Sequence, residues 1–182
     1  IGMVTDAIWT DFDKDGQIDL IVVGEWMAPK FYKNQKGKLI SSKIDHHLKG
    51  LWQSIAEFDI DGDGDKDYLL GNWGLNTKLK ANRDNPLKMY YLDFDANGST
   101  ETILAQEKNG NYYPVNGLDR LVGQLAYLRK KFPDYKSFAG KTIEEIFDKE
   151  QLEKAEILKV ETLASGYLLN ENGNFSFKAF KN

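Results

Sequence analysis

The stretch Asp59-Ile60-Asp61-Gly62-Asp63-Gly64-Asp65-Lys66-Asp67 decides how this sequence is interpreted, because its acidic residues alternate around a glycine turn. Residues 11–19 (DFDKDGQID) and 93–101 (DFDANGSTE) repeat the same spacing. All three segments fit D-x-D-x-[DN]-G-x-x-[DE], and we refer to them in chain order as loop 1 (11–19), loop 2 (59–67) and loop 3 (93–101). One Asp/Gly-rich segment is usually a solvated turn. Three in one register indicate a repeated site.

The spacing in these loops suits a cage of oxygen ligands around a hard divalent cation. Side chains at positions 1, 3 and 5 converge, glycine at position 6 permits the sharp turn, position 7 offers its carbonyl and the acid at position 9 closes the shell. Six or more such oxygens favour Ca²⁺ over Mg²⁺, so we expect up to three calcium ions. The candidate ligands are Asp11, Asp13, Asp15, Gln17 and Asp19; Asp59, Asp61, Asp63, Asp65 and Asp67; and Asp93, Asp95, Asn97, Ser99 and Glu101.

An EF-hand shares the first half of this pattern but needs a glutamate at position 12 and helices on both sides. Position 12 is instead Val22, Leu70 or Leu104. The flanking segments are short runs rich in β-branched, aromatic and other apolar residues, which is typical of strands. We therefore predict loops that connect antiparallel strands: 7–10 and 20–23, 54–58 and 68–70, and 89–92 and 102–104.

The distribution of charge agrees with cation binding in the loops. The formal net charge is −4, yet the loops hold 12 of the 28 acidic residues and only Lys14 and Lys66 among the 24 basic ones. Without cations, each loop would hold three to five carboxylates in mutual repulsion. The chain has no cysteine, which excludes disulfides and thiolate metal sites.

The metal loops, each followed by an apolar strand, resemble the FG-GAP or VCBS-type repeat of integrin-alpha-like β-propellers. The resemblance covers residues 1–107 and returns at 166–180. It implies an all-β fold of about three antiparallel, propeller-like blades, with a calcium ion in the loop between the first two strands of each blade. The resemblance implies that the ligands are the side chains at positions 1, 3, 5 and 9, including Asn97, and the position-7 carbonyls of Gln17, Asp65 and Ser99.

We accordingly expect a single repeat domain over residues 1–182. Its blades would span about 1–45, 50–85 and 86–182, and the hairpin at 166–180 would be the outer pair of the third blade. The sequence opens on Ile1 inside a strand-like pattern, and three blades do not close a ring, so we expect a segment of a longer protein. Remaining blades of that protein, or a second copy, would cover the open flanks.

Residues 117–155 change to a helical pattern. Apolar residues recur at spacings of three and four from Leu118 to Phe132, Asn116 can cap the start, and Thr142 with Glu145 forms a capping box. We predict an α-helical insertion that packs its apolar face on the third blade. The alternative is that it forms or covers a ligand surface.

No catalytic motif is present, and the adjacent His46 and His47 cannot easily share a metal. Trp52, Trp73, Tyr90 and Tyr91, with Asn72, would suit a sugar-stacking platform, but such residues also fill blade cores, and we favour the core. The favoured function is a non-enzymatic, calcium-binding module for a protein or glycan ligand. The alternative is the propeller part of a polysaccharide lyase or hydrolase.

The expected location is extracellular, periplasmic or at the cell surface, where millimolar calcium saturates weak sites. No segment is long and apolar enough to span a membrane. The basic residues outside the loops are scattered, so nucleic acid is not an expected partner.

Overall fold

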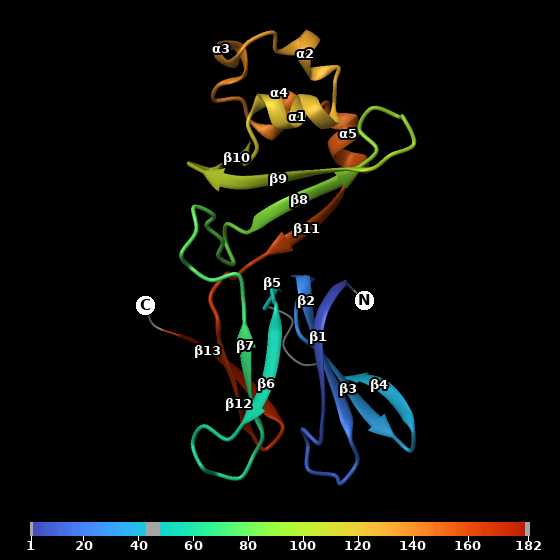
Figure 1. The fold of residues 1–182 in the computed structure, drawn as a ribbon, viewed down its shortest axis with the longest axis vertical. Helices are drawn as coiled ribbons and strands as arrows, with labels where there is room; N and C mark the ends of the chain where they lie inside the picture. Colours follow the sequence, from blue (N-terminus) through green and yellow to red (C-terminus); the bar gives the residue numbers. More distant parts are fainter. Residues whose placement is uncertain (1, 43–47, 181–182) are drawn as a thin grey trace. The chain divides into compact units, whose positions relative to one another are not determined.

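A computed structural model describes residues 2–42 and 48–180 and divides the chain into two compact units. Unit 1 combines residues 1–78 with 160–182, and unit 2 is the intervening segment 79–159. The structure is mostly β, with 43% of residues in strands and 14% in helices. Its three separate antiparallel sheets confirm the predicted all-β fold of propeller-like blades (Figure 1).

Blade 1 in unit 1 is an antiparallel sheet with the strand order β1-β2-β3-β4. Its strands are β1 (Met3–Thr10), β2 (Asp19–Met27), β3 (Lys30–Gln35) and β4 (Lys38–Ser42), and a short strand, β5 (Gly50–Leu51), pairs with β2. The predicted strands at 7–10 and 20–23 both lie within these elements. Loop 1 joins β1 to β2, as its spacing predicted.

Blade 2 in unit 1 is assembled from two distant parts of the chain. Strands β6 (Ser54–Phe58) and β7 (Asp67–Gly71) flank loop 2, and the sheet continues through β12 (Gly166–Glu171) and β13 (Asn174–Ala179). The hairpin at 166–180 therefore belongs to the second blade, and its assignment to the third blade was wrong. Unit 2 is inserted in the sequence between the second and third strands of blade 2.

The pairing register shows that β12 corresponds to β3. In blade 1, Leu20 directly after loop 1 lies opposite Tyr32, and in blade 2, Tyr68 directly after loop 2 lies opposite Leu168. Each third strand then turns through the same Asn-x-x-Gly segment, residues 34–37 in blade 1 and 170–173 in blade 2. Blades 1 and 2 are thus two copies of one unit, the second interrupted by 79–159.

Blades 1 and 2 share one hydrophobic core. Ile21, Val23 and Phe31 of blade 1 pack with Tyr68 and Leu70 of blade 2, and all five are almost fully buried. Aromatic rings from the two blades contact one another edge-to-face or at a tilt, which is the geometry that aromatic pairs prefer. This core holds the ends of loops 1 and 2 in fixed positions.

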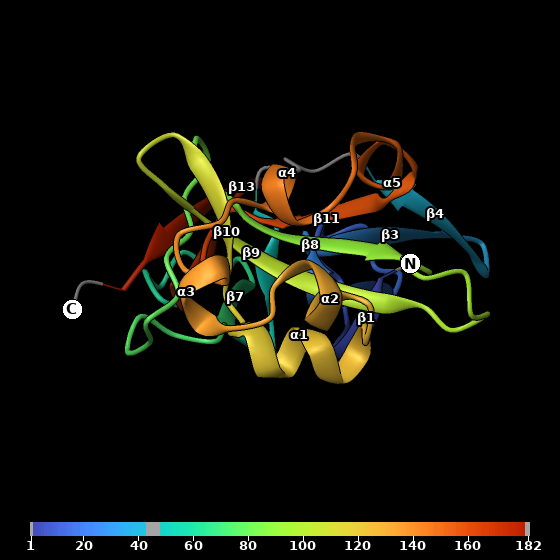
Figure 2. The ribbon, with the colours of Figure 1, turned by 90° about the horizontal axis from the view of Figure 1, so that it is seen from above.

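Unit 2 carries loop 3 in the sheet β10-β9-β8-β11. Strands β8 (Leu87–Leu92) and β9 (Glu101–Lys108) flank the loop, followed by β10 (Asn111–Pro114) and, after the helices, β11 (Glu156–Val160). The helices are α1 (Leu118–Gln124), α2 (Leu128–Lys131), α3 (Tyr135–Phe138), α4 (Ile143–Ile146) and α5 (Lys149–Lys154). Figures 1 and 2 show these helices on one side of the sheet.

The helices confirm the predicted insertion at 117–155 and correct its details. Their apolar residues form one core with Tyr90, Phe94 and Ile103 of the sheet, so the insertion packs on the loop 3 sheet as expected. The capping box of Thr142 and Glu145 is present. Helix α1 begins after Gly117, so Asn116 is not its cap.

The strand pairing in blade 2 predicts a specific disulfide. Leu69 lies opposite both Tyr167 on β12 and Ala56 on β6, so these three residues form a row across the sheet. Direct antiparallel partners have Cα atoms about 4.5–5.5 Å apart, within disulfide range. In this cysteine-free chain, the double variant Leu69→Cys/Tyr167→Cys should cross-link intramolecularly on oxidation, as measured by non-reducing electrophoresis and peptide mass spectrometry.

The matched control is Ala56→Cys/Tyr167→Cys, whose positions are two strands apart, roughly 10 Å, and should stay reduced. Cross-linking of the control pair but not of the first pair would contradict this sheet order.

Candidate metal-binding loops

The three loops share one backbone conformation. The glycines at position 6, Gly16, Gly64 and Gly98, have φ angles of 82°, 83° and 89°, in the left-handed region that side chains disfavour. This agrees with the predicted role of glycine at the turn. Position 4 is also left-handed, with φ of 58° at Lys14 and 57° at Ala96, and only loop 2 places a glycine there. Non-glycine residues pay about 1 kcal/mol for this conformation.

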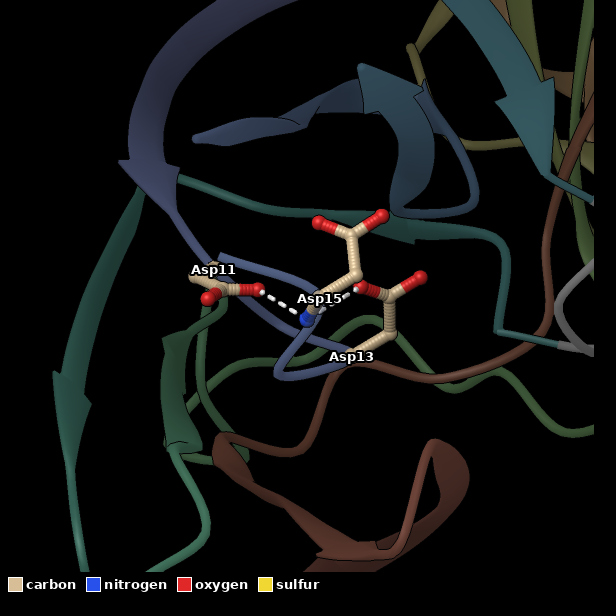
Figure 3. Close-up of side chains that lie close together, drawn as sticks. All are labelled: Asp11, Asp13 and Asp15. Carbon is tan, nitrogen blue, oxygen red and sulfur yellow. Dashed lines mark hydrogen bonds between the residues drawn. The ribbon is translucent and has the colours of Figure 1, made fainter. Parts of the chain in front are cut away.

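In loop 1 the side chains at positions 1, 3 and 5 converge. Carboxylate oxygens of Asp11, Asp13 and Asp15 all lie within 4.8 Å of one another. Asp11 Oδ1 and Asp13 Oδ1 accept hydrogen bonds from the Asp15 backbone N–H at 3.1 and 3.3 Å (Figure 3). Asp11 Oδ2 accepts from the Gly16 N–H at 2.9 Å. These backbone donors hold the carboxylates in place around the turn.

Loop 2 brings together positions 1, 3 and 9. Carboxylate oxygens of Asp59, Asp61 and Asp67 lie within 4.8 Å of one another. Asp59 Oδ2 accepts from the Gly64 N–H at 3.1 Å, which repeats the bond between positions 1 and 6 in loop 1. Asp63, at position 5 of loop 2, accepts a hydrogen bond from the Asp65 backbone N–H at 2.7 Å.

Loop 3 in unit 2 has the same construction. Asp93, Asp95 and Glu101 place carboxylate oxygens within 4.8 Å of one another. Asp93 Oδ2 accepts from the Gly98 N–H at 2.8 Å, and Asn97 Oδ1 occupies the position-5 role by accepting from the Ser99 N–H at 2.7 Å. The substitutions of Asn97 and Glu101 for aspartate therefore preserve the loop geometry while removing one charge.

The acid at position 9 is buried in every loop. Asp19, Asp67 and Glu101 are 0%, 1% and 7% exposed. Asp67 Oδ2 accepts from the N–H of Ile60 at position 2, and Glu101 Oε2 accepts from the corresponding N–H of Phe94, at 2.8 and 2.9 Å. In loops 2 and 3 the last residue is thereby tied back to the start of the loop.

The third strand supplies a second bond to this acid in unit 1. The Asn34 backbone N–H on β3 donates to Asp19 Oδ1 at 2.7 Å, and the Asn170 N–H on β12 donates to Asp67 Oδ1 at 2.8 Å. The asparagine side chains add donors to the loop carbonyl at position 8: Asn34 Nδ2 to Ile18 at 2.9 Å and Asn170 Nδ2 to Lys66 at 3.2 Å. Loop 2 is therefore completed by a residue about a hundred positions downstream.

One oxygen in loop 1 is left without a partner. Asp19 Oδ2 is buried and has no hydrogen bond among the described residues. Burial raises the pKa of Asp19, and the backbone N–H groups of Asn34 and Phe12 oppose that shift. A buried carboxylate oxygen without a partner is costly unless a cation or donor reaches it.

The donor set of all three loops fits a hard divalent cation. Three carboxylates within 4.8 Å repel one another by about 1 kcal/mol per pair even in a water-like dielectric. Clustered carboxylate oxygens are the ligands that calcium takes, and the unpartnered Asp19 Oδ2 adds an acceptor that the protein itself does not satisfy.

Two lysines partly neutralise the acidic loops of unit 1. Lys14 in loop 1 pairs with Asp65 of loop 2 and, with the Asn172 N–H, lowers the pKa of that carboxyl. The Asp65 side chain is thus engaged away from the cluster, so its expected contribution remains the backbone carbonyl. Lys33 on β3 pairs with Asp13 and with Asp15. These acids raise the pKa of Lys33 well above its ordinary value.

The structure brings together nine of the expected side-chain ligands in three groups, one per loop. Among the others, Asp19 is buried beside loop 1, Asp63 and Asn97 cap backbone N–H groups, and the position-7 carbonyls stay a prediction. Sequence reasoning missed Asn34, Asn170 and Lys33. The repeated Asn-x-x-Gly segments at 34–37 and 170–173 were the signal that could have found the two asparagines.

A known protein family matches the part of the chain that contains loops 1 and 2. The family model described as an FG-GAP-like repeat matches residues 11–70, which run from the first ligand of loop 1 to the strand after loop 2. The chain contains an FG-GAP-like repeat. This confirms the resemblance to FG-GAP-type repeat proteins. Comparisons with curated proteins and with solved structures gave no match.

The aromatic residues considered as a sugar platform fall into a buried group and an exposed group. Trp52 and Tyr90 are buried in the two cores, as favoured, whereas Trp73 and Tyr91 are 55% and 45% exposed. The Asn72 side chain bonds to the Leu51 and Trp73 N–H groups and to loop carbonyls, so it is committed to local structure. His46 and His47 lie outside the described residues.

No helix in the described part of the chain has the length and apolar character needed to cross a membrane.

The structure predicts that Asn170 is critical to blade 2. Asn170→Ala should remove the side-chain bonds to the carbonyls of Phe12 and Lys66 and to the Gly173 N–H, leaving buried polar groups unpaired. The expected loss is about 3 kcal/mol in the free energy of unfolding, measured by urea denaturation. Asn174→Ala is the control, because Asn174 is exposed and makes one long bond, and it should cost under about 0.5 kcal/mol. Equal losses in the two variants would contradict the role given to Asn170.

Proposed function

We propose that this chain is a calcium-stabilised FG-GAP-like repeat module in which each loop holds one calcium ion. The observation that carries the proposal is the threefold convergence of carboxylates within 4.8 Å, with Asp19 Oδ2 buried and unpartnered beside loop 1. An ion would supply the missing partner and cancel the repulsion within each cluster. The role of the ion would be structural, since the loop acids are ionised ligands held by backbone donors.

Calcium should raise the melting temperature in a loop-dependent way. The wild-type chain should melt several degrees higher in calcium than in EGTA, because an ion that binds only the native state stabilises it by mass action. Asp61→Ala removes a ligand from loop 2 and should reduce this calcium-dependent increase, as measured by calorimetric scanning. Asp84→Ala, an exposed acid outside the loops, should leave it unchanged. A melting temperature indifferent to calcium in the wild-type chain would refute the calcium assignment.

Loop 3 should behave independently of loops 1 and 2, because it belongs to a separate compact unit. Asp95→Ala should abolish calcium-dependent protection from hydrogen exchange in β8 and β9 while leaving that of β6 and β7 intact. Loss of protection in all four strands would contradict independent sites. Loop 3 has one fewer carboxylate than loop 1, so we expect its affinity to be the lowest.

We propose that the module acts outside the cell, where millimolar calcium keeps weak sites filled, and that it binds a protein or glycan ligand without catalysis. FG-GAP-like repeats are typical of extracellular domains, which supports this location. The calcium ions would fix the loops and strands that present the binding surface.

We propose that further blades, from a longer chain or a second copy, pack against the open faces of unit 1. On blade 1, Trp9, Leu20 and Tyr32 lie in one row across the sheet, and Trp9 is 62% exposed. On blade 2, Leu69 and Phe180 are 38% and 47% exposed. Exposed apolar rows on adjacent sheets are what a stacking repeat would bury.

A glycan array probed with and without calcium would test the binding function, followed by hydrolase and lyase assays on each glycan that binds. Calcium-dependent binding without turnover would support a binding module. Turnover of a bound glycan would replace this proposal with the alternative of a polysaccharide-acting enzyme.

A further inference from the structure

Lys33 is the feature that distinguishes loop 1 from loop 2. Its ammonium group reaches from β3 to loop 1, where it pairs with Asp13 Oδ2 and lies 3.1 Å from Asp15 Oδ2. These are two of the three acids whose oxygens converge in loop 1. The lysine therefore neutralises the carboxylates that a calcium ion would need.

Blade 2 provides an internal comparison. Asn34 and Asn170 occupy corresponding positions, since each donates its backbone N–H to the position-9 acid. The residue before Asn34 is Lys33, and the residue before Asn170 is the half-buried Leu169. No lysine in the described residues forms an ion pair with Asp59, Asp61 or Asp67. The three carboxylates that converge in loop 2 thus have no paired lysine, since Lys14 pairs with Asp65, which lies outside that group.

We propose that Lys33 is a tethered counter-cation that competes with calcium for Asp13 and Asp15, so that loop 1 binds calcium more weakly than loop 2. This inference rests on the proposed function, because it concerns the relative affinity of two calcium sites. For an ion to be coordinated by Asp13 and Asp15, the ammonium group must first leave them.

The charge balance gives the size of the effect. A unit positive charge about 5 Å from a divalent ion opposes binding even in a water-like dielectric, and breaking the ion pair adds to the cost. Replacing Lys33 by an uncharged residue should therefore raise the calcium affinity of loop 1 about tenfold. The same ion pair supports loop 1 when calcium is absent.

A reciprocal exchange on the full chain tests this inference. Lys33→Leu places on β3 the residue that blade 2 has at this position, and Leu169→Lys places on β12 the residue that blade 1 has there. Calcium titration is followed by NMR at the Gly16 and Gly64 amides, which bond to the position-1 carboxylates and report each loop separately. Lys38→Leu is the matched control, because it removes an exposed lysine on β4 that makes no ion pair among the described residues.

The calcium concentration at half-titration of the Gly16 signal should fall about tenfold in Lys33→Leu and stay unchanged in Lys38→Leu. The corresponding concentration for Gly64 should rise in Leu169→Lys. An unchanged Gly16 midpoint in Lys33→Leu, or an equal fall in Lys38→Leu, would overturn the inference while leaving calcium binding in place. If neither glycine responds to calcium in the wild-type chain, the proposed function itself fails.

Discussion

The structure depends on carboxylates that are forced together at the turn between two antiparallel strands. Each loop gathers three acids within 4.8 Å. The first of them accepts hydrogen bonds from the backbone N–H at position 6 and from that at position 5 in loops 1 and 3 or position 4 in loop 2. The acid at position 9 is buried, so the loop cannot relieve repulsion by turning this group to water. Strand pairing thus imposes an electrostatic cost that a divalent cation is suited to remove.

This constraint also explains how the two blades of unit 1 are joined. The position-9 acids bond to Asn34 and Asn170 on the third strands, and the Asn170 side chain reaches the carbonyl of Phe12 in loop 1. Lys14 pairs with Asp65 between the loops. Loops 1 and 2 are therefore linked to each other and to the third strands of their blades, and an ion in one would stabilise more than its own turn.

Much of the fold was predictable because its signals are local. Position 12 of each loop is apolar where an EF-hand needs glutamate, and the strands flanking each loop lie where the short apolar runs predicted them. The capping box at Thr142 was predicted from two residues three positions apart. The loop acids were identified because spacing alone determines which side chains converge.

The composition of blade 2 was missed because it depends on contacts far apart in sequence. Chain-adjacent strands usually pair, so the hairpin at 166–180 was assigned to the preceding sheet, whereas it pairs with β7 across the 81-residue unit 2. The helical pattern of 118–132 was correct in phase, yet the helix is interrupted between α1 and α2. Lys33 was missed since nothing local links it to Asp13, twenty residues earlier.

Anomalous diffraction from crystals grown in calcium tests the central claim most directly. We predict three peaks, one per loop, each about 2.3–2.6 Å from carboxylate oxygens of Asp11, Asp59 or Asp93 and their neighbours. Well-ordered loops without an anomalous peak at millimolar calcium would contradict the assignment of these clusters as calcium sites.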